Sequence, residues 1–179
     1  MTHAVDVYLR ELERRDLERL NAWRNDAEIA EGLGNNGLFI SRDVDEQWFQ
    51  HYMANRDRAV RLAIVVKDSD EYIGNVNLTS IHPVNRSAEF SILIGERRYW
   101  GRGIGRSAGE VMLRHAFLDL NLHRVHLSVL SGHDYAIRLY HSLGFVDEGT
   151  ARECVFKHGR FHDQRLMAIL KTDYDRRRA

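Results

Sequence analysis

The chain has 179 residues, in which 26 lysines and arginines balance 26 aspartates and glutamates. That length suits one domain with its own hydrophobic core, and the zero net charge argues against a nucleic acid or an anionic membrane as partner. The lone cysteine, Cys154, excludes an internal disulfide framework and is expected to be a buried thiol. A polar start and the lack of an apolar run of about 20 residues predict a cytoplasmic protein.

Hydrophobic periodicity in the first half of the chain predicts a strand, two helices and three more strands. The strands are expected at 5–10, 61–66, 72–79 and 88–94, and the helices at 16–27 and 41–55. Asp16 is expected to cap the first helix, and Ser41 or Asp43 the second. The segment 28–40 between the helices is rich in glycine and asparagine and predicts a mobile loop.

The stretch from Tyr99 to Ser107 opens the next helical pattern with three glycines, at 101, 103 and 105. Because these residues lack side chains, consecutive backbone N–H groups can close around an anion at the positive end of the helix. The helix is expected to run to about Leu120. Arg102 and Arg106 flank the turn and would add positive charge. The stretch therefore predicts a binding site for a phosphate or a diphosphate.

Flanking residues separate the kinds of glycine-rich loop that bind phosphates. A nucleoside-triphosphate loop ends in Gly-Lys-Ser or Gly-Lys-Thr, whereas Arg106 stands at the lysine position here. A dinucleotide-binding turn follows its strand directly, whereas the expected strand ends at Ile94, well before Gly101. A loop for the diphosphate of coenzyme A remains, and a glycine-rich connection without a ligand is the alternative.

The rest of the chain predicts a strand at 124–130, a helix at 135–143 and a hairpin with strands at 150–156 and 163–170. Gly144 is expected to end the helix as its C-cap, and His158 and Gly159 to form the hairpin turn. The basic residues at 176–178 are expected to be frayed. The complete element order is β-α-α-β-β-β-α-β-α-β-β.

This order, together with several motifs, resembles the GCN5-related N-acetyltransferases, the GNAT superfamily, over almost the whole chain. Residues 100–105, Trp-Gly-Arg-Gly-Ile-Gly, match the glycines of the family signature, with tryptophan at its first position as in the branch of ribosomal-protein alanine and spermidine N-acetyltransferases. Further matches are Ala88–Phe90, Ala136–Tyr140, Leu143–Phe145, Glu148–Gly149, Gly159, Asp163 and Met167. The resemblance implies an α/β fold in one N-acetyltransferase domain, 1–172, with a mixed, mostly antiparallel sheet, helices on both faces and a basic tail at 173–179.

The resemblance also implies a site for acetyl-CoA. In that family the strand before the glycine loop is splayed from its neighbour, and its free backbone groups, here at Ile92, Leu93 and Ile94, bind the pantetheine arm. His133 stands where the family usually has an asparagine that contacts the coenzyme. Backbone amides of the loop take the diphosphate, which implies the residues Gly101, Arg102, Gly103, Ile104, Gly105, Arg106 and Ser107.

Acetyl transfer requires an unprotonated amine and a thiolate that receives a proton as it leaves. Tyr140 stands where the family has its general acid, and the alternative is a residue of the core. Glu89, in a strand among apolar residues, is the candidate base, acting directly or through water; the alternative is a carboxylate paired with Arg86 or another basic neighbour. We therefore expect direct transfer from acetyl-CoA to a primary amine, without a metal.

The acceptor stays open among protein N-terminal amines, polyamines, and amino sugars or other small-molecule amines. Segment 28–40 and the two final strands are expected to select it, and the acidic residues of the first half either favour a cationic amine or are solvated helix faces. Trp23, Trp48 and Tyr52 either pack the first helices on the sheet or form a wall of the acceptor pocket. A catalytically silent acyl-CoA sensor is the alternative function, and the sequence is compatible with a homodimer.

Overall fold

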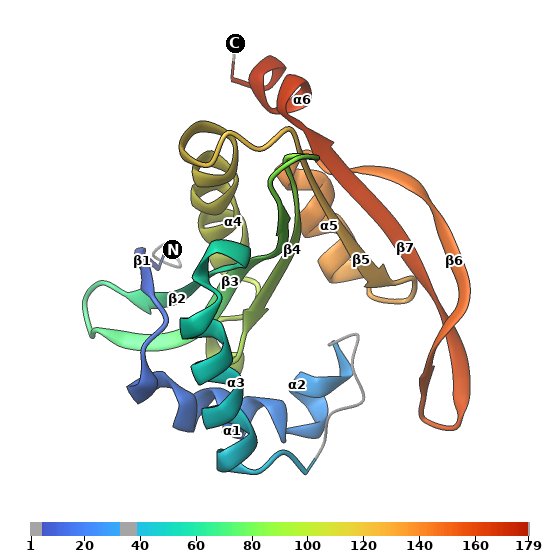
Figure 1. The fold of residues 1–179 in the computed structure, drawn as a ribbon. Helices are drawn as coiled ribbons and strands as arrows, with labels where there is room; N and C mark the ends of the chain where they lie inside the picture. Colours follow the sequence, from blue (N-terminus) through green and yellow to red (C-terminus); the bar gives the residue numbers. More distant parts are fainter. Residues whose placement is uncertain (1–4, 33–38, 179) are drawn as a thin grey trace.

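The computed structural model describes residues 5–32 and 39–178. Its centre is a seven-stranded sheet in the order β1-β2-β3-β4-β5-β7-β6, with helices on both faces (Figure 1). Neighbouring strands run antiparallel except β4 and β5, which are parallel. This confirms the mixed, mostly antiparallel α/β sheet that the sequence predicts.

The elements follow the predicted order, with one additional helix near each end of the chain. The strands are β1 Val7–Glu11, β2 Val60–Val66, β3 Glu71–His82, β4 Ser87–Ile94, β5 Arg124–Leu130, β6 Val146–Lys157 and β7 Arg160–Leu170. The helices are α1 Leu17–Arg24, α2 Ala27–Glu31, α3 Arg42–Ala54, α4 Ile104–Arg114, α5 Asp134–Leu143 and α6 Lys171–Arg176. Short 3₁₀ turns lie at Arg14–Asp16, Arg56–Arg58 and Arg97–Tyr99, and a π-helical turn at His115–Asp119 extends α4.

Two hydrophobic cores lie on opposite faces of the sheet, because successive side chains of a strand point to opposite faces. On one face, strand residues such as Ile64 pack together with residues of α4 and α5. On the other face, Ala63 and Val65 pack with residues of α1 and α3. Trp23 belongs to this second core, with its ring 4.9 Å from that of Tyr72. The aromatic residues of the first helices thus pack those helices on the sheet, as the first of the two interpretations holds.

Helices α4 and α5 approach each other closely at two glycines. A Cβ atom added at Gly109 would lie 2.6 Å from a methyl carbon of Leu143, and one at Gly105 would lie 3.0 Å from a methyl carbon of Leu139. Larger residues there would push the helices apart. The close contact therefore fixes the start of α4 against α5, the helix that carries Tyr140.

In the first half of the chain, the residues that cap the helices differ in part from the prediction, because an expected capping side chain has other hydrogen-bond partners. Asp16 does not cap α1; it is buried and accepts two hydrogen bonds of 2.7 Å from the Arg10 guanidinium. Ser41, and not Asp43, caps α3, since its hydroxyl accepts the Val44 N–H at 3.3 Å. Asp26, which the sequence predicts to be helical, caps α2 by accepting two backbone N–H groups, and α2 continues into the predicted loop. Residues 33–38 of that loop lie outside the described residues.

The C-terminal region also differs in part from the prediction. Gly144 ends α5 at φ +98°, and His158 and Gly159 lie between β6 and β7, as predicted. The tail is not frayed over its described part: α6 packs Tyr174 against Phe117, with the ring centroids 4.9 Å apart. Cys154 is exposed instead of buried, because it lies in a bulge of β6.

Candidate active site

The sheet opens between its two parallel strands. β4 and β5 pair only over Ser87–Glu89 and Arg124–His126, and no pairing joins them beyond Glu89. On its other side β4 stays paired with β3 as far as Ile94. The remainder of β4 therefore has one free edge, the splayed arrangement that the resemblance implies.

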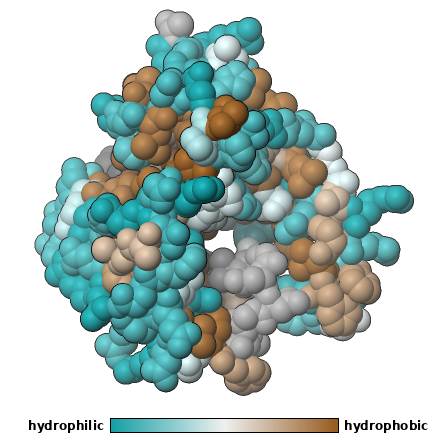
Figure 2. Space-filling model, in the orientation of Figure 1, coloured by the Kyte–Doolittle hydropathy of each residue, from teal (hydrophilic) through white to brown (hydrophobic). Residues whose placement is uncertain are grey.

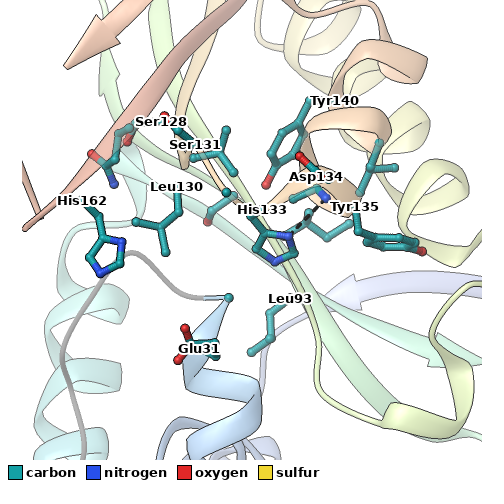
Figure 3. A pocket seen from close by; sticks show the side chains of 18 of the residues that line it. Glu31, Leu93, Ser128, Leu130, Ser131, His133, Asp134, Tyr135, Tyr140 and His162 are labelled. Atoms are coloured by element: carbon teal, nitrogen blue, oxygen red, sulfur yellow. Dashed lines mark hydrogen bonds between the residues drawn. The ribbon is translucent and has the colours of Figure 1, made fainter. Parts of the chain in front are cut away.

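A cavity of about 1300 Å³ occupies this opening. Its walls come from the end of β4, the start of α4, the first two turns of α5, helix α2, and strands β5, β6 and β7 (Figure 3). In the space-filling view a hollow lies between the two sides of the molecule (Figure 2). Glu89, Ile92, Leu93, Ile94, Ile104, Gly105, His133 and Tyr140, all singled out in the sequence, line the cavity.

The glycine loop has the conformation that the glycines permit. Gly101 and Gly103 have φ of +73° and +78°, in the left-handed region that disfavours other residues. A Cβ atom at either position would meet nothing within 4 Å, so open space lies over the loop. Gly103 also forms the N-cap of α4, and its carbonyl accepts the Ser107 N–H at 3.1 Å. The first N–H groups of α4 are thus available to an anion.

Backbone groups at two of the predicted coenzyme contacts already have partners within the protein. The indole N–H of Trp100 donates to the Ile94 carbonyl at 2.7 Å. The Gly101 N–H donates to the hydroxyl oxygen of Tyr135 at 3.3 Å. Sequence reasoning missed Tyr135, because its neighbour across the loop is 34 residues away. The tryptophan at the first signature position thus secures the end of β4.

The two arginines of the loop differ in their surroundings. Arg106 forms an ion pair with Glu110, one turn further along α4, at 3.0 Å. Arg102 is exposed, and its guanidinium carbon lies 5.9 Å from the centre of the Tyr99 ring. Among the described residues it has no ion-pair partner. Arg102 is therefore the loop cation that is free to meet a negatively charged ligand.

Tyr140 belongs to the core and to the cavity at once. Its ring packs edge-on against Phe90 and Phe145, with centroids 6.2 Å and 5.9 Å away. Within the described chain its hydroxyl has no hydrogen-bond partner, and in Figure 3 the side chain borders the cavity. Burial raises the pKa of Tyr140 to about 12. The phenol therefore stays protonated at neutral pH and is free to donate a hydrogen bond into the cavity.

Glu89 lies at the point where the two strands separate. Its neighbours Ala88 and Phe90 face the core under α4 and α5, so Glu89 points to the opposite face of the sheet. The alternative pairing with Arg86 is not formed, since that guanidinium donates to the Asn121 carbonyl at 2.9 Å. No other side chain of the described residues forms an ion pair with Glu89. Its carboxylate is thus available to the cavity.

His133 caps α5. Its Nδ1 accepts the Ala136 N–H at 3.4 Å, drawn as a dashed line in Figure 3. The other ring nitrogen, Nε2, faces the end of α2, since a Cβ atom at Gly32 would lie 2.8 Å from it. His133 thus caps the helix from the position where the family usually has asparagine, a residue that also caps helices well. Its place directly before the helical pattern is the sequence signal for that role.

Hydrogen bonds and an ion pair connect the tip of the β6–β7 hairpin to α2. The Lys157 ammonium donates to the carbonyls of Ala30 and Glu31 at 2.6 and 2.8 Å, where the end of the helix favours a cation. His158 and the Glu31 carboxylate approach to 2.5 Å. Desolvation lowers the pKa of Lys157. These contacts join α2 to the hairpin at the part of the cavity wall that Glu31 and Lys157 form.

A bulge in β6 places Glu153 at the wall of the cavity. Between the pairs Ala151–Gln164 and Val155–His162, three residues of β6 lie opposite the single residue Asp163. Glu153 adopts φ +49°, and its N–H donates to the Asp163 carboxylate at 2.7 Å. Its own carboxylate has no ion-pair partner in the described part of the chain, and the residue lines the cavity. Sequence reasoning missed Glu153, since nothing in β6 alone signals the bulge.

Histidine and acidic residues do not assemble into a metal site in the part of the chain that the structure covers: over 5–32 and 39–178, no three His, Cys, Asp or Glu side chains are placed to hold an ion. His158 and His162 instead contact Glu31 and the Lys157 carbonyl. None of the described helices is long and apolar enough to cross a membrane.

Comparison with known proteins identifies the family of this chain. Residues 6–146 match the family model of the acetyltransferase (GNAT) domain. The chain therefore belongs to the GNAT family, as the sequence predicts, and is an acetyl-CoA-dependent N-acetyltransferase. Spermidine N(1)-acetyltransferase of Vibrio cholerae is 34% identical to it over 167 residues, which are 93% of this chain and 94% of the relative.

Solved structures of relatives agree. The crystal structure of Vibrio cholerae spermidine N-acetyltransferase in complex with CoA and spermine has a TM-score of 0.88 and 32% identity, and the match covers 94% of this chain and 97% of that one. A structure of the Vibrio cholerae spermidine/spermine N-acetyltransferase in complex with manganese ions has a TM-score of 0.81 and 30% identity, with 97% of each chain covered.

Proposed function

We propose that this enzyme transfers the acetyl group of acetyl-CoA directly to a primary amine of a polyamine, a small flexible acceptor with several positive charges. The observation that supports the transfer best is the cavity in the opening between β4 and β5, which is lined by both Tyr140 and Glu89. The reaction needs one group that accepts a proton and one that donates it. Acetyl-CoA and an amine bound together in this cavity would both lie within reach of Tyr140 and Glu89.

The coenzyme lies along the free edge of β4 in this proposal. Backbone groups of Ile92 and Leu93 bind the pantetheine arm, because β5 does not pair with that part of the strand. The diphosphate lies at the glycine loop and the start of α4, where Gly103 leaves room and the first helical N–H groups lack partners. Tyr140 then stands beside the thioester.

The chemical steps follow from these positions. Glu89 takes a proton from the substrate ammonium, directly or through water, and the freed nitrogen attacks the thioester carbonyl carbon. A C–N bond forms and the C–S bond breaks, and the departing thiolate takes the phenolic proton of Tyr140. The second proton that the nitrogen loses restores the phenol. The buried surroundings that raise the pKa of Tyr140 to about 12 also favour a neutral thiol over a thiolate.

Carboxylates on the part of the cavity wall that β4, β6 and β7 form support a polycationic substrate. Glu89, Glu153 and Asp163 line it without an ion-pair partner among the described residues. Two cations, Lys157 and Arg160, line it as well, and the Lys157 ammonium is turned onto the carbonyls of α2. Unpaired carboxylates at the cavity wall attract and orient a cation. The relatives named as spermidine N-acetyltransferases support the same acceptor class.

A panel of amines tests the proposal. Purified enzyme is given acetyl-CoA with spermidine, spermine, peptides that carry a free N-terminus, and amino sugars, and thiol release is followed together with the mass of the acetylated product. We expect the highest kcat/KM with a polyamine, by at least about tenfold, which corresponds to about 1.4 kcal/mol of transition-state binding. Equal or faster turnover of a peptide or an amino sugar would overturn the acceptor class while leaving the acetyltransferase chemistry intact.

A further inference from the structure

We propose that Tyr135 is a direct ligand of the coenzyme, whose phenolic O–H donates a hydrogen bond to the diphosphate. Tyr135 is the second residue of α5, and its side chain is 53% exposed. The hydroxyl oxygen accepts the Gly101 N–H at 3.3 Å across the opening. The proposal rests on the placement of the diphosphate at the glycine loop.

The hydroxyl proton of Tyr135 is unused. Its oxygen accepts from Gly101, and among the described residues it donates to no acceptor. A hydroxyl that accepts a hydrogen bond becomes a better donor of its own proton. A diphosphate offers acceptor oxygens only, and hydrogen bonds to charged groups are stronger than neutral ones. The Gly101 N–H, which the resemblance assigns to the diphosphate, would thus act through the phenol.

Space and neighbouring groups favour the same ligand. Tyr135 lines the cavity together with Trp100, Ile104 and Gly105. A Cβ atom at Gly101 would meet nothing within 4 Å, so room for a phosphate lies beside the hydrogen bond. Arg102, next along the loop, is a cation without an ion-pair partner in the described chain. A neutral donor, a cation and the start of α4 therefore border one open space.

A purely structural role explains the contact poorly. The end of β4 is already held by the 2.7 Å bond from Trp100 to the Ile94 carbonyl, and the start of α4 by the bond from Ser107 to the Gly103 carbonyl. A neutral, solvent-exposed hydrogen bond of 3.3 Å adds little stability to a loop that is held on both sides. Its exposure instead suits a group that meets a ligand from solvent.

The experiment compares two acetyl donors, acetyl-CoA and S-acetylpantetheine, which has the thioester and the pantetheine arm but no diphosphate. With Tyr135→Phe we expect KM for acetyl-CoA to rise about tenfold with kcat unchanged, the loss of one hydrogen bond to a charged group. Both constants for S-acetylpantetheine should equal those of the wild type. Tyr174→Phe is the matched control: the Tyr174 hydroxyl accepts a hydrogen bond from Arg178, which follows α6, and its loss should affect neither donor.

Two results would overturn the role of Tyr135. An unchanged KM for acetyl-CoA would mean that the phenol makes no contact with the diphosphate, and an equal rise for both donors would mean that it only shapes the loop. Gly103→Val tests the underlying placement separately. If that variant binds CoA as tightly as the wild type, the diphosphate lies elsewhere; if it loses affinity while Tyr135→Phe does not, only the proposal for Tyr135 fails.

Discussion

Glu89 and His126 form the last residue pair of the parallel ladder between β4 and β5, and the two strands separate directly beyond them. In a parallel pair, opposite residues project from the same face of the sheet. The Nδ1 atom of His126 is buried and finds no hydrogen-bond partner among the described residues. The two side chains therefore mark the line where the closed sheet ends and the cavity begins, with the candidate base on the cavity side.

Replacing Glu89 tests its role as a base. In Glu89→Gln the amine would have to lose its proton to water before it binds, so kcat/KM should fall most on the acidic side of the pH profile and the acidic limb should move to higher pH. The measurement is kcat/KM from about pH 6 to 10, with Glu18→Gln, whose carboxylate pairs with Arg42 on the surface, as control. A normal rate with an unmoved limb would leave Glu89 a structural residue.

Replacing Tyr140 tests the general acid. Tyr140→Phe keeps the ring packed against Phe90 and Phe145, so the melting temperature and the affinity for acetyl-CoA should change little. Loss of the proton donor should lower kcat by about 10²–10⁴. Because burial raises the pKa of this phenol to about 12, the wild type should show no fall in rate from its ionisation below about pH 11. Turnover of the variant at wild-type speed would exclude this acid.

Bulk at Gly103 should block the coenzyme. Gly103→Val places a branched side chain in the open space over the loop, at a φ of +78° that costs a non-glycine residue about 1–2 kcal/mol. Titration calorimetry should then detect no CoA binding. Gly159→Val is the matched control, because Gly159 has nearly the same φ, +76°, and equally open surroundings at the hairpin turn. The control should lose similar stability but keep CoA affinity; loss of affinity in both would point to a general effect of strain.

Replacing Glu153 should weaken binding of the amine, and replacing it by glycine should also stabilise the fold. Removing its carboxylate in Glu153→Gln should raise KM for a polyamine several-fold with kcat nearly unchanged, since the residue attracts the acceptor and takes no part in proton transfer. Glu153→Gly should raise KM similarly, yet stabilise the fold by about 0.5–1 kcal/mol, because glycine tolerates the φ of +49°. Steady-state kinetics and thermal melts measure both effects. An unchanged polyamine KM in both variants would remove Glu153 from the acceptor site.

Local sequence patterns predicted those elements whose bounds depend only on residues within the element. The strand Arg124–Leu130 has its predicted bounds, because its alternating valines and leucines need only one apolar face. The start of α4 follows from Gly103, and the end of α5 from Gly144, since both glycines adopt a positive φ. The opening of the sheet followed from the family resemblance and not from periodicity.

The remaining features depend on partners that are distant in the sequence or only visible in space. Asp16 looks like a helix cap in the sequence but is held by Arg10. The bulge that exposes Cys154 and places Glu153 at the cavity wall forms because β6 has three residues opposite one residue of β7. Tyr135 and Gly101 meet through the packing of α4 on α5. Single-sequence periodicity contains none of these pairings.

The opening between β4 and β5 has a consequence for the order of events in a catalytic cycle. Tyr140 lies in the core under α4 and α5, whereas Glu89 points to the opposite face of the sheet. In the function proposed above, the coenzyme and the amine would then reach the opening from opposite faces. Under that proposal neither substrate would have to leave before the other binds, and no acetylated enzyme would form. Initial rates measured against both substrates should therefore give intersecting lines, and one molecule that joins coenzyme A to a polyamine through the opening should compete with both.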